Sequence, residues 1–170
     1  MASLMAVGMT GMIELRRHSQ LPIHAHRCGW GALTREQMLG WSYPAWSKLW
    51  RLAGADHMHV NGLDNKFSEA NESVIASAQS LSAPLFSDVP MKAVPVFSSG
   101  QTVRQAAGTL EAVGTPDLIV TAGGGVVAHP HGISNGVKAM RDAWDAAMTG
   151  IKLDVYAKDH PALAAALSVY

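Results

Sequence analysis

Two short apolar segments of the chain each carry a pair of histidines in the pattern His-x-His. The pairs are His24 with His26 and His57 with His59. Alternate residues of a β-strand point to the same face, so each segment, as a strand, presents both imidazoles on one side. Grouped imidazoles can exchange protons with a substrate or hydrogen-bond to it. For any single histidine, a satisfied place in the core is the alternative interpretation.

A zinc site is a second alternative for the histidines, but their spacing does not favour it. Neither pair has the i, i+4 spacing of ligands on a helix, and no cysteine or carboxylate accompanies the pairs at ligand spacing. Acid–base chemistry or substrate hydrogen bonding is therefore the favoured function of these side chains.

A single lysine follows the second histidine pair. Asn61-Gly62 ends the expected strand, and Lys66 lies among small polar residues in the loop beyond it. Such a loop can bring a cation over whatever the histidines face. This arrangement is typical of the mouth of an active site.

Two glycine- or serine-rich segments follow later strands: Ser98-Ser99-Gly100 and Gly123-Gly124-Gly125. Backbone N–H groups in such segments are unhindered, as a phosphate cradle requires. A tight turn explains either segment equally well. Together they match the phosphate site that barrels build from their last two loops. We interpret His129-Pro130-His131 as loop structure.

The elements that must position these residues alternate along the chain. Strands are expected at residues 3–7, 21–26, 56–60, 93–97 and 118–121. Helices are expected at residues 10–19, 43–52, 68–80, 102–113, 136–148 and 161–167, with Ser68 as a candidate N-cap and Gly54 as a C′ residue.

This alternation predicts an α/β fold with parallel strands and helical crossovers. In a (β/α)₈ TIM barrel every strand end of this kind contributes to one mouth, and about four to five strands can be counted here, which makes a partial barrel. A complete barrel needs about 250 residues, and this chain has 170. We assign residues 1–150 to the barrel portion and residues 151–170 to a helical tail.

The composition is that of a packed intracellular enzyme. Hydrophobic residues make up 48% and charged residues 15%, and 13 basic residues balance 13 acidic ones. No basic tract indicates nucleic-acid binding, and no apolar run is long enough for a membrane span. Cys28 is the single cysteine, which favours a reducing compartment, and the start of the chain lacks the basic region of a signal peptide. We expect a cytoplasmic protein.

Four motifs in order resemble the carboxyl half of the ribulose-bisphosphate carboxylase (RuBisCO) large chain. They are Leu21-Pro22-Ile23-His24-Ala25-His26-Arg27, Asp56-His57-Met58-His59 with Lys66, Pro95-Val96-Phe97-Ser98-Ser99-Gly100, and Gly123-Gly124-Gly125 with His129-Pro130. The resemblance covers nearly the whole chain. It implies a (β/α)₈ barrel whose strand tips surround one anionic substrate.

The resemblance also implies roles for individual residues. Lys66 matches the mobile-loop lysine that closes over substrate, and His26 matches a histidine near the reacting carbons. Arg27 and His59 match positions that contact one phosphate. The remaining matches are two substrate contacts and the second phosphate cradle, at Ser98, Gly100, Gly123 and Gly124.

Three departures separate this chain from true carboxylases. Trp30 stands where they have a further histidine, the lysine loop has less valine and glycine, and Ser99 interrupts a serine–glycine–glycine motif. The chain is therefore more similar to the RuBisCO-like (form IV) proteins, which enolise, isomerise, decarboxylate or transcarboxylate other phosphorylated sugars and sugar acids. It resembles most the branch that acts on 3-oxo-isoapionate 4-phosphate.

The resemblance implies Mg²⁺ as the cofactor, held in the family by a carbamylated lysine and two carboxylates on an earlier strand. Neither these ligands nor the general-base lysine matches a position in this sequence. The family's amino-terminal domain, which completes the site of the neighbouring subunit, has no match either. We therefore expect the isolated chain to be inactive and the full-length form to be a homodimer or higher oligomer.

Two other hypotheses remain. The chain could be a non-catalytic phosphate-binding or assembly module that keeps the anion sites without the metal. An unrelated barrel isomerase is the third hypothesis. The partner that we expect is a phosphorylated sugar substrate, with no nucleic acid and no membrane.

Overall fold

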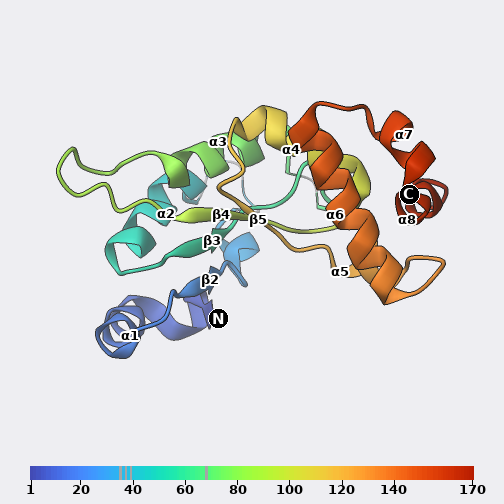
Figure 1. Cartoon of the computed structure of the whole chain (residues 1–170). Coiled ribbons are helices and arrows are strands. Elements are labelled where there is room, and N and C mark those ends of the chain that lie inside the picture. The colour runs from blue at the N-terminus through green and yellow to red at the C-terminus, as the bar shows by residue number, and fades with distance from the viewer. Residues whose placement is uncertain (35, 37, 39, 68) are drawn as a thin grey trace. The chain divides into compact units, whose positions relative to one another are not determined.

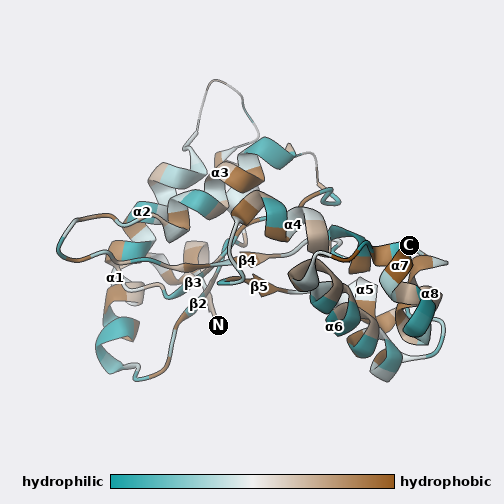
Figure 2. Ribbon diagram, turned by 45° about the horizontal axis from the view of Figure 1, so that its top comes forward, coloured by the Kyte–Doolittle hydropathy of each residue, from teal (hydrophilic) through white to brown (hydrophobic). Residues whose placement is uncertain are grey.

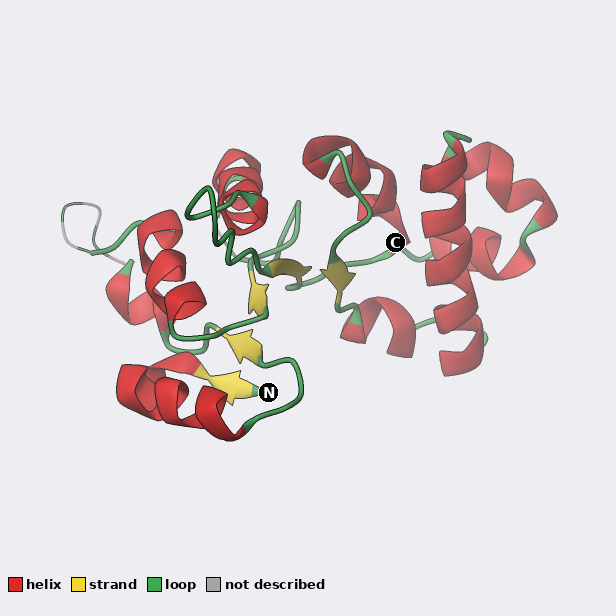
Figure 3. Cartoon of the chain, turned by 60° about the vertical axis from the view of Figure 1, so that its left-hand side comes forward, coloured by secondary structure: helices red, strands yellow, loops and turns green. Residues whose placement is uncertain are grey.

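The structure, a computed structural model, describes residues 1–34, 36, 38, 40–67 and 69–170, and helices alternate with strands along it (Figures 1 and 3). The strands are β1 (Ala2–Ser3), β2 (His24–His26), β3 (His57–His59), β4 (Val94–Phe97) and β5 (Ile119–Val120). The helices are α1 (Leu4–His18), α2 (Tyr43–Leu52), α3 (Asn71–Ser82), α4 (Ala106–Val113), α5 (Gly123–Val127), α6 (Ile133–Thr149), α7 (Leu153–Tyr156) and α8 (Pro161–Leu167). Short 3₁₀ turns are η1 (Trp30–Leu33), η2 (Val103–Gln105) and η3 (Ala157–Asp159).

The strands form one sheet in the order β1-β2-β3-β4-β5. The pairs β1–β2, β2–β3 and β3–β4 are parallel. Parallel neighbours require a crossover, and α1, α2 and α3 supply it between successive strands. This arrangement confirms the predicted α/β fold, a part of a (β/α)₈ barrel.

The described chain divides into two compact units. Unit 1 comprises Met1–Val60, Ile75–Val96 and Asp117–Ile119. Unit 2 comprises Asn61–Val74, Phe97–Pro116 and Val120–Tyr170. The division predicted at residue 150 stays a prediction.

Most predicted elements agree with the structure, apart from the first strand. The helices at 43–52 and 161–167 have the expected bounds, and Gly54 has a φ of 99° just beyond α2. The strand expected at 3–7 is wrong, because the chain turns into α1 at Leu4 after only two strand residues. A short apolar run does not by itself distinguish a strand from a helix. The N-cap predicted at Ser68 lies outside the described residues.

Small side chains make the core of unit 2. Its members are Val103, Ala106, Ala139, Ala143, Ala157, Ala162, Leu163 and Ala166. Alanine allows helices to approach closely, and α6 packs against both α4 and α8. The alternation of hydrophobic and hydrophilic residues along α6 is visible in Figure 2. Among the described residues, no helix combines the length and the apolar character needed to cross a bilayer.

Aromatic residues dominate one side of the unit 1 core. The ring of Trp30 lies 4.6 Å from that of Trp46 and 5.5 Å from that of Tyr43, measured between centroids, and Trp46 also contacts Trp50. Trp30 is buried. The tryptophan that replaces the carboxylase histidine is therefore a core residue.

Arg51 connects α2 to the loop that precedes β4. Its guanidinium donates to the carbonyl oxygens of Met91 (2.8 Å), Ser80 (2.6 Å), Ala83 (2.5 Å) and Pro90 (3.4 Å). The side chain is only 2% exposed. The planar fork of arginine can satisfy several carbonyls at once, which an ammonium on a flexible stem cannot do.

We expect the substitution Arg51→Met to lower the free energy of unfolding by roughly 3 kcal/mol, because buried carbonyl oxygens lose their donor. Urea denaturation followed by circular dichroism measures the change. Lys48→Met is the matched control, since Lys48 is exposed on the same helix, and it should change the value by less than about 0.5 kcal/mol. Equal effects of both substitutions would contradict the role given to Arg51.

Candidate functional site

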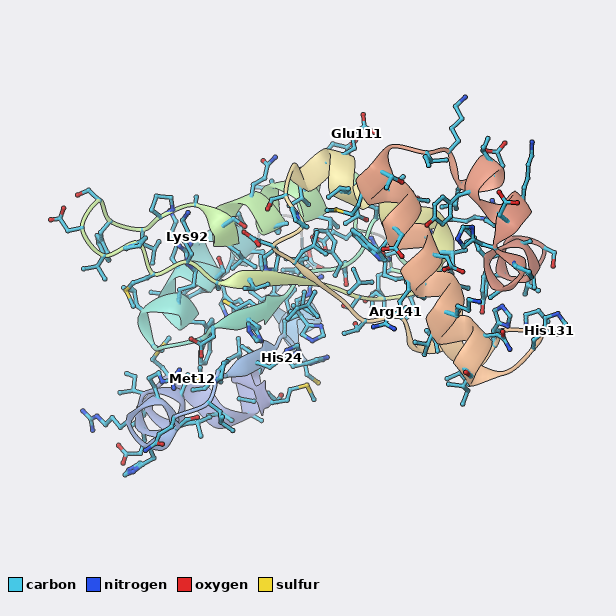
Figure 4. The ribbon with its side chains drawn as sticks, in the orientation of Figure 1. Met12, His24, Lys92, Glu111, His131 and Arg141 are labelled. Carbon is cyan, nitrogen blue, oxygen red and sulfur yellow. The ribbon has the colours of Figure 1, made fainter. Side chains whose placement is uncertain are left out.

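The four paired histidines gather at one place in unit 1. The register of β2 and β3 sets His24 beside His57 and Ala25 beside Met58. The ring centroids of His24 and His59 are 4.8 Å apart, and those of His26 and His59 are 4.5 Å apart. Met58, which points the other way, is fully buried. These ring contacts confirm the prediction that the two strands present their histidines on a shared face. Figure 4 labels His24 among them.

Hydrogen bonds restrict the proton positions of these imidazoles. The Nε2 atoms of His24 and His59 are 2.7 Å apart, so one nitrogen carries a proton and the other accepts it. The backbone N–H of Cys28 donates to Nδ1 of His26 at 3.0 Å. The neutral form of His26 therefore carries its proton on Nε2, where it can donate to a substrate oxygen.

Burial keeps His59 neutral. Desolvation lowers the pKa of His59 to about 4, and repulsion from His26, His24 and Arg27 acts in the same direction. Burial and the neighbouring His57 also lower the pKa of His24. Both shifts favour the neutral imidazoles of His24 and His59, and a permanent cation lies beside them.

That cation is Arg27, one residue beyond β2. Its guanidinium carbon lies 5.1 Å from the centroid of the Tyr43 ring, a cation–π contact. Tyr43 also donates its hydroxyl proton to the carbonyl oxygen of His59. Tyr43 thus orients both residues that the resemblance assigns to one phosphate. Sequence reasoning missed this tyrosine, since it treated residues 43–52 only as a helix.

In unit 2, residues 62–67, here called the lysine loop, contact residues 98–101, here called the serine turn. The N–H of Gly62 donates to the carbonyl oxygen of Ser98 at 2.6 Å, and the N–H of Lys66 donates to that of Ser99 at 3.2 Å. Gly100 has a φ of 87° and lies against Lys66. The structure therefore brings together Lys66, Ser98 and Gly100.

The glycine triplet opens α5 instead of forming a turn before a helix. A Cβ at Gly123 or Gly124 would meet no atom within 4 Å, so the backbone there can be approached closely. A Cβ at Gly125 would overlap the carbonyl oxygen of Gln101. Gly125 is thus required by packing, whereas Gly123 and Gly124 remain open to a ligand. The hydroxyl of Tyr170 donates to the carbonyl oxygen of Gly124 at 3.1 Å.

The predicted site residues thus fall into two groups. His26, Arg27 and His59 lie together in unit 1, and the others lie in unit 2. That His26, Arg27, His59, Lys66, Ser98 and Gly124 surround a single substrate stays a prediction. His129 is buried as loop structure, with Nε2 hydrogen-bonded to the carbonyl oxygen of Ala162 at 2.9 Å.

The donor set does not fit magnesium. Mg²⁺ prefers an octahedral shell of oxygen ligands, whereas the histidine cluster offers nitrogen. Within the part of the chain that the structure describes, no group of three or more histidine, cysteine, aspartate or glutamate side chains could hold a metal ion.

Comparison with known proteins decides the family. The model of the ribulose bisphosphate carboxylase large chain, catalytic domain, matches residues 1–170. The chain belongs to this RuBisCO family. The match to the family extends over the whole chain. The hypothesis of an unrelated barrel isomerase is therefore excluded.

Relatives within the RuBisCO family include a transcarboxylase/hydrolase and a decarboxylase. The chain is 58% identical over 170 residues to the 3-oxo-isoapionate-4-phosphate transcarboxylase/hydrolase of Xanthobacter autotrophicus, covering all of this chain and 41% of the relative. It is 45% identical over 168 residues to the 3-oxo-isoapionate-4-phosphate decarboxylase of Rhizobium etli, covering 97% of this chain and 40% of the relative. The chain thus spans about two fifths of the relatives' length.

A solved RuBisCO-like structure agrees with the fold. The crystal structure of a RuBisCO-like protein from Burkholderia fungorum matches with a TM-score of 0.96 and 42% identity, covering 99% of this chain and 42% of that protein. The similarity to RuBisCO-like proteins predicted from the sequence is therefore confirmed.

We expect the stability of the chain to fall as the pH drops from 6.5 to about 4. The pKa of His59 is about 4 in the folded state, against 6.5 as its ordinary value. Above pH 6.5 both states are neutral, and between the two values the unfolded state binds more protons. Urea unfolding across this range should show the loss, and His59→Gln should flatten the profile between these two pH values. An NMR titration that finds His59 protonating near pH 6.5 would contradict this.

Alanine substitutions should separate the two kinds of glycine in α5. Gly123→Ala should leave stability unchanged or raise it by about 0.5–1 kcal/mol, because alanine favours a helix and its Cβ enters open space. Gly125→Ala should lower stability by roughly 1–3 kcal/mol through overlap with Gln101. Thermal unfolding of both variants measures the difference, and the reverse order would show that the packing is wrongly assigned.

Proposed function

We propose that this chain is the carboxyl-terminal part of a magnesium-dependent RuBisCO-like enzyme that acts on a phosphorylated keto-sugar acid through an enediolate. The candidate substrate is 3-oxo-isoapionate 4-phosphate. The observation that carries the proposal is the 58% identity to the transcarboxylase/hydrolase, which extends over the whole of this chain. Magnesium would be bound by residues outside this chain and would stabilise the enediolate oxygens.

The proposed roles follow from charge and proton position. Lys66 supplies the cation that stabilises a developing carboxylate or enolate. His26 holds a proton on Nε2 and donates a hydrogen bond to a substrate oxygen near the reacting carbons. Arg27 supplies the permanent charge for one phosphate, and the neutral His59 beside it accepts or donates a hydrogen bond there.

The second anionic group of the substrate is assigned to unit 2. The backbone of Gly123 and Gly124 leaves space for close approach of phosphate or carboxylate oxygens. Ser98 and Gly100 complete the substrate contacts. Both groups of residues would have to act on one substrate, and the full-length protein is proposed to do so as a homodimer or higher oligomer.

A second candidate function is a non-catalytic phosphate-binding or assembly module. One observation favours it for the isolated chain: the described residues hold no cluster able to bind a metal ion. In that case the chain would bind sugar phosphates equally well with and without magnesium, and it would not turn them over.

Calorimetric titration with 3-oxo-isoapionate 4-phosphate separates the two candidates. It should be run with and without Mg²⁺ on this chain and on a protein extended to the family's full length. We expect magnesium to strengthen binding by the extended protein and to leave binding by the short chain unchanged, with turnover only in the extended protein. If magnesium changed the binding affinity of neither protein and neither turned the substrate over, the result would support the non-catalytic phosphate-binding module.

In the extended protein, Lys66→Met should lower kcat by about 10²–10³, the usual cost of removing a group that stabilises charge in the transition state. Lys92→Met is the matched control, because Lys92 is an exposed lysine in the loop before β4. It should leave kcat unchanged. If Lys66→Met retained full activity, the proposed role of this lysine would be wrong.

A further inference from the structure

A chain of side-chain hydrogen bonds links the serine turn to the residues around the lysine loop. The hydroxyl of Ser99 donates to Oδ1 of Asn61 at 2.9 Å. Nδ2 of Asn61 donates to Oε2 of Glu69 at 2.5 Å, and the hydroxyl of Ser73 donates to Oε1 of Glu69 at 3.0 Å. Asn61 is buried at 5% exposure, so both ends of its amide are fixed by these partners.

The lysine loop also holds its own shape. Nδ2 of Asn65 donates to the carbonyl oxygens of Gly62 (3.1 Å) and Glu69 (2.9 Å), and its Oδ1 accepts the N–H of Phe67 (3.0 Å). The buried amide of Gln101 lies against Gly62 and donates to the carbonyl oxygen of Leu63 at 3.1 Å. The side chains of Asn65 and Gln101 thus fix the backbone of the lysine loop.

Backbone strain at the serine turn supports a specific role for Ser99. Its φ is 72°, in the left-handed region that favours glycine. This conformation costs a serine more than it would cost a glycine, which has no Cβ. What serine adds is the hydroxyl, which reaches Asn61 while the carbonyl oxygen of the same residue accepts the N–H of Lys66. The strained residue Ser99 therefore binds both Asn61, through its hydroxyl, and the backbone of Lys66, through its carbonyl oxygen.

We propose that Ser99, Asn61 and Glu69 are positioning residues for Lys66, holding the lysine loop against the serine turn through contacts made within this chain. The inference rests on the role proposed for Lys66 only where it concerns catalysis. The claim that the network holds the lysine loop in place does not depend on a catalytic role for Lys66. The carboxylate of Glu69 makes the hydrogen bond from Asn61 charge-assisted, which gives the network its strength.

A polarity swap tests the network. Asn61→Asp keeps the acceptor for Ser99 but sets a second carboxylate against Glu69. Adding Glu69→Gln restores a donor–acceptor pair in the opposite direction and returns the net charge to that of the natural chain. Glu69→Gln alone should be mild, because its amide oxygen can still accept from Asn61. A variant that only damages the fold would not be rescued by the second substitution.

Trypsin provides the readout, because it cleaves after Lys66. Cleavage of the Lys66–Phe67 bond, followed by mass spectrometry at low protease concentration, reports the opening of the loop. Asn61→Asp should raise its rate by about 10- to 100-fold, as expected for the loss of a buried charge-assisted hydrogen bond. The double variant should return to within about threefold of the natural chain, less than the effect of one ordinary hydrogen bond. Cleavage after Lys92, in unit 1, is the internal reference.

Two results would overturn the inference: an unchanged rate at Lys66 in Asn61→Asp, or an equal rise at Lys66 and Lys92 that the second substitution does not reverse. In the extended protein the same single variant should lower kcat with KM retained, and the double variant should restore kcat. If Lys66→Met is fully active while the cleavage pattern holds, the proposed function fails and the loop network stands. If Lys66→Met is inactive while cleavage is unchanged, the network fails and the proposed function stands.

Discussion

The in-register parallel pairing of β2 with β3 is the constraint on which the histidine cluster depends. Because the register places His24 beside His57, every second residue of both strands meets on one face. A shift by one residue would send the imidazoles into the core and Met58 outward. The same pairing crowds four titratable rings together, and burial with mutual repulsion then lowers the pKa of His59 to about 4. Strand pairing thus favours the neutral form of His59 by placing it among other imidazoles in a buried position.

A second constraint acts in unit 2, where amide and carboxylate side chains hold the lysine loop. Asn65 satisfies all its polar atoms within the loop, and Asn61 connects the loop to Ser99 and Glu69. A loop with such contacts has a defined backbone conformation. These polar side chains act together, since each supplies a hydrogen-bond partner to the lysine loop or to a residue that contacts it.

The sequence allowed the fold class and the family to be predicted because these depend on local periodicity and ordered motifs. Helices 43–52 and 161–167 have strong apolar spacing and clear boundaries, and both were predicted with their observed bounds. The segment 3–7 was wrongly expected to be a strand because five apolar or small residues carry no periodicity. The candidate site residues were chosen from motif positions, and their convergence on one substrate stays a prediction.

By itself, the sequence determined membership of the RuBisCO family, the parallel α/β architecture and the candidate histidines, lysine and glycines. Only the tertiary structure decided that Trp30 belongs to the core and that Asn61 joins Ser99 to Glu69. It also decided that packing requires a glycine at position 125 and not at position 123. The reason is that these properties depend on partners distant in sequence. Ser99 lies 38 positions from Asn61, and no local pattern states which donor will face which acceptor once the chain has folded.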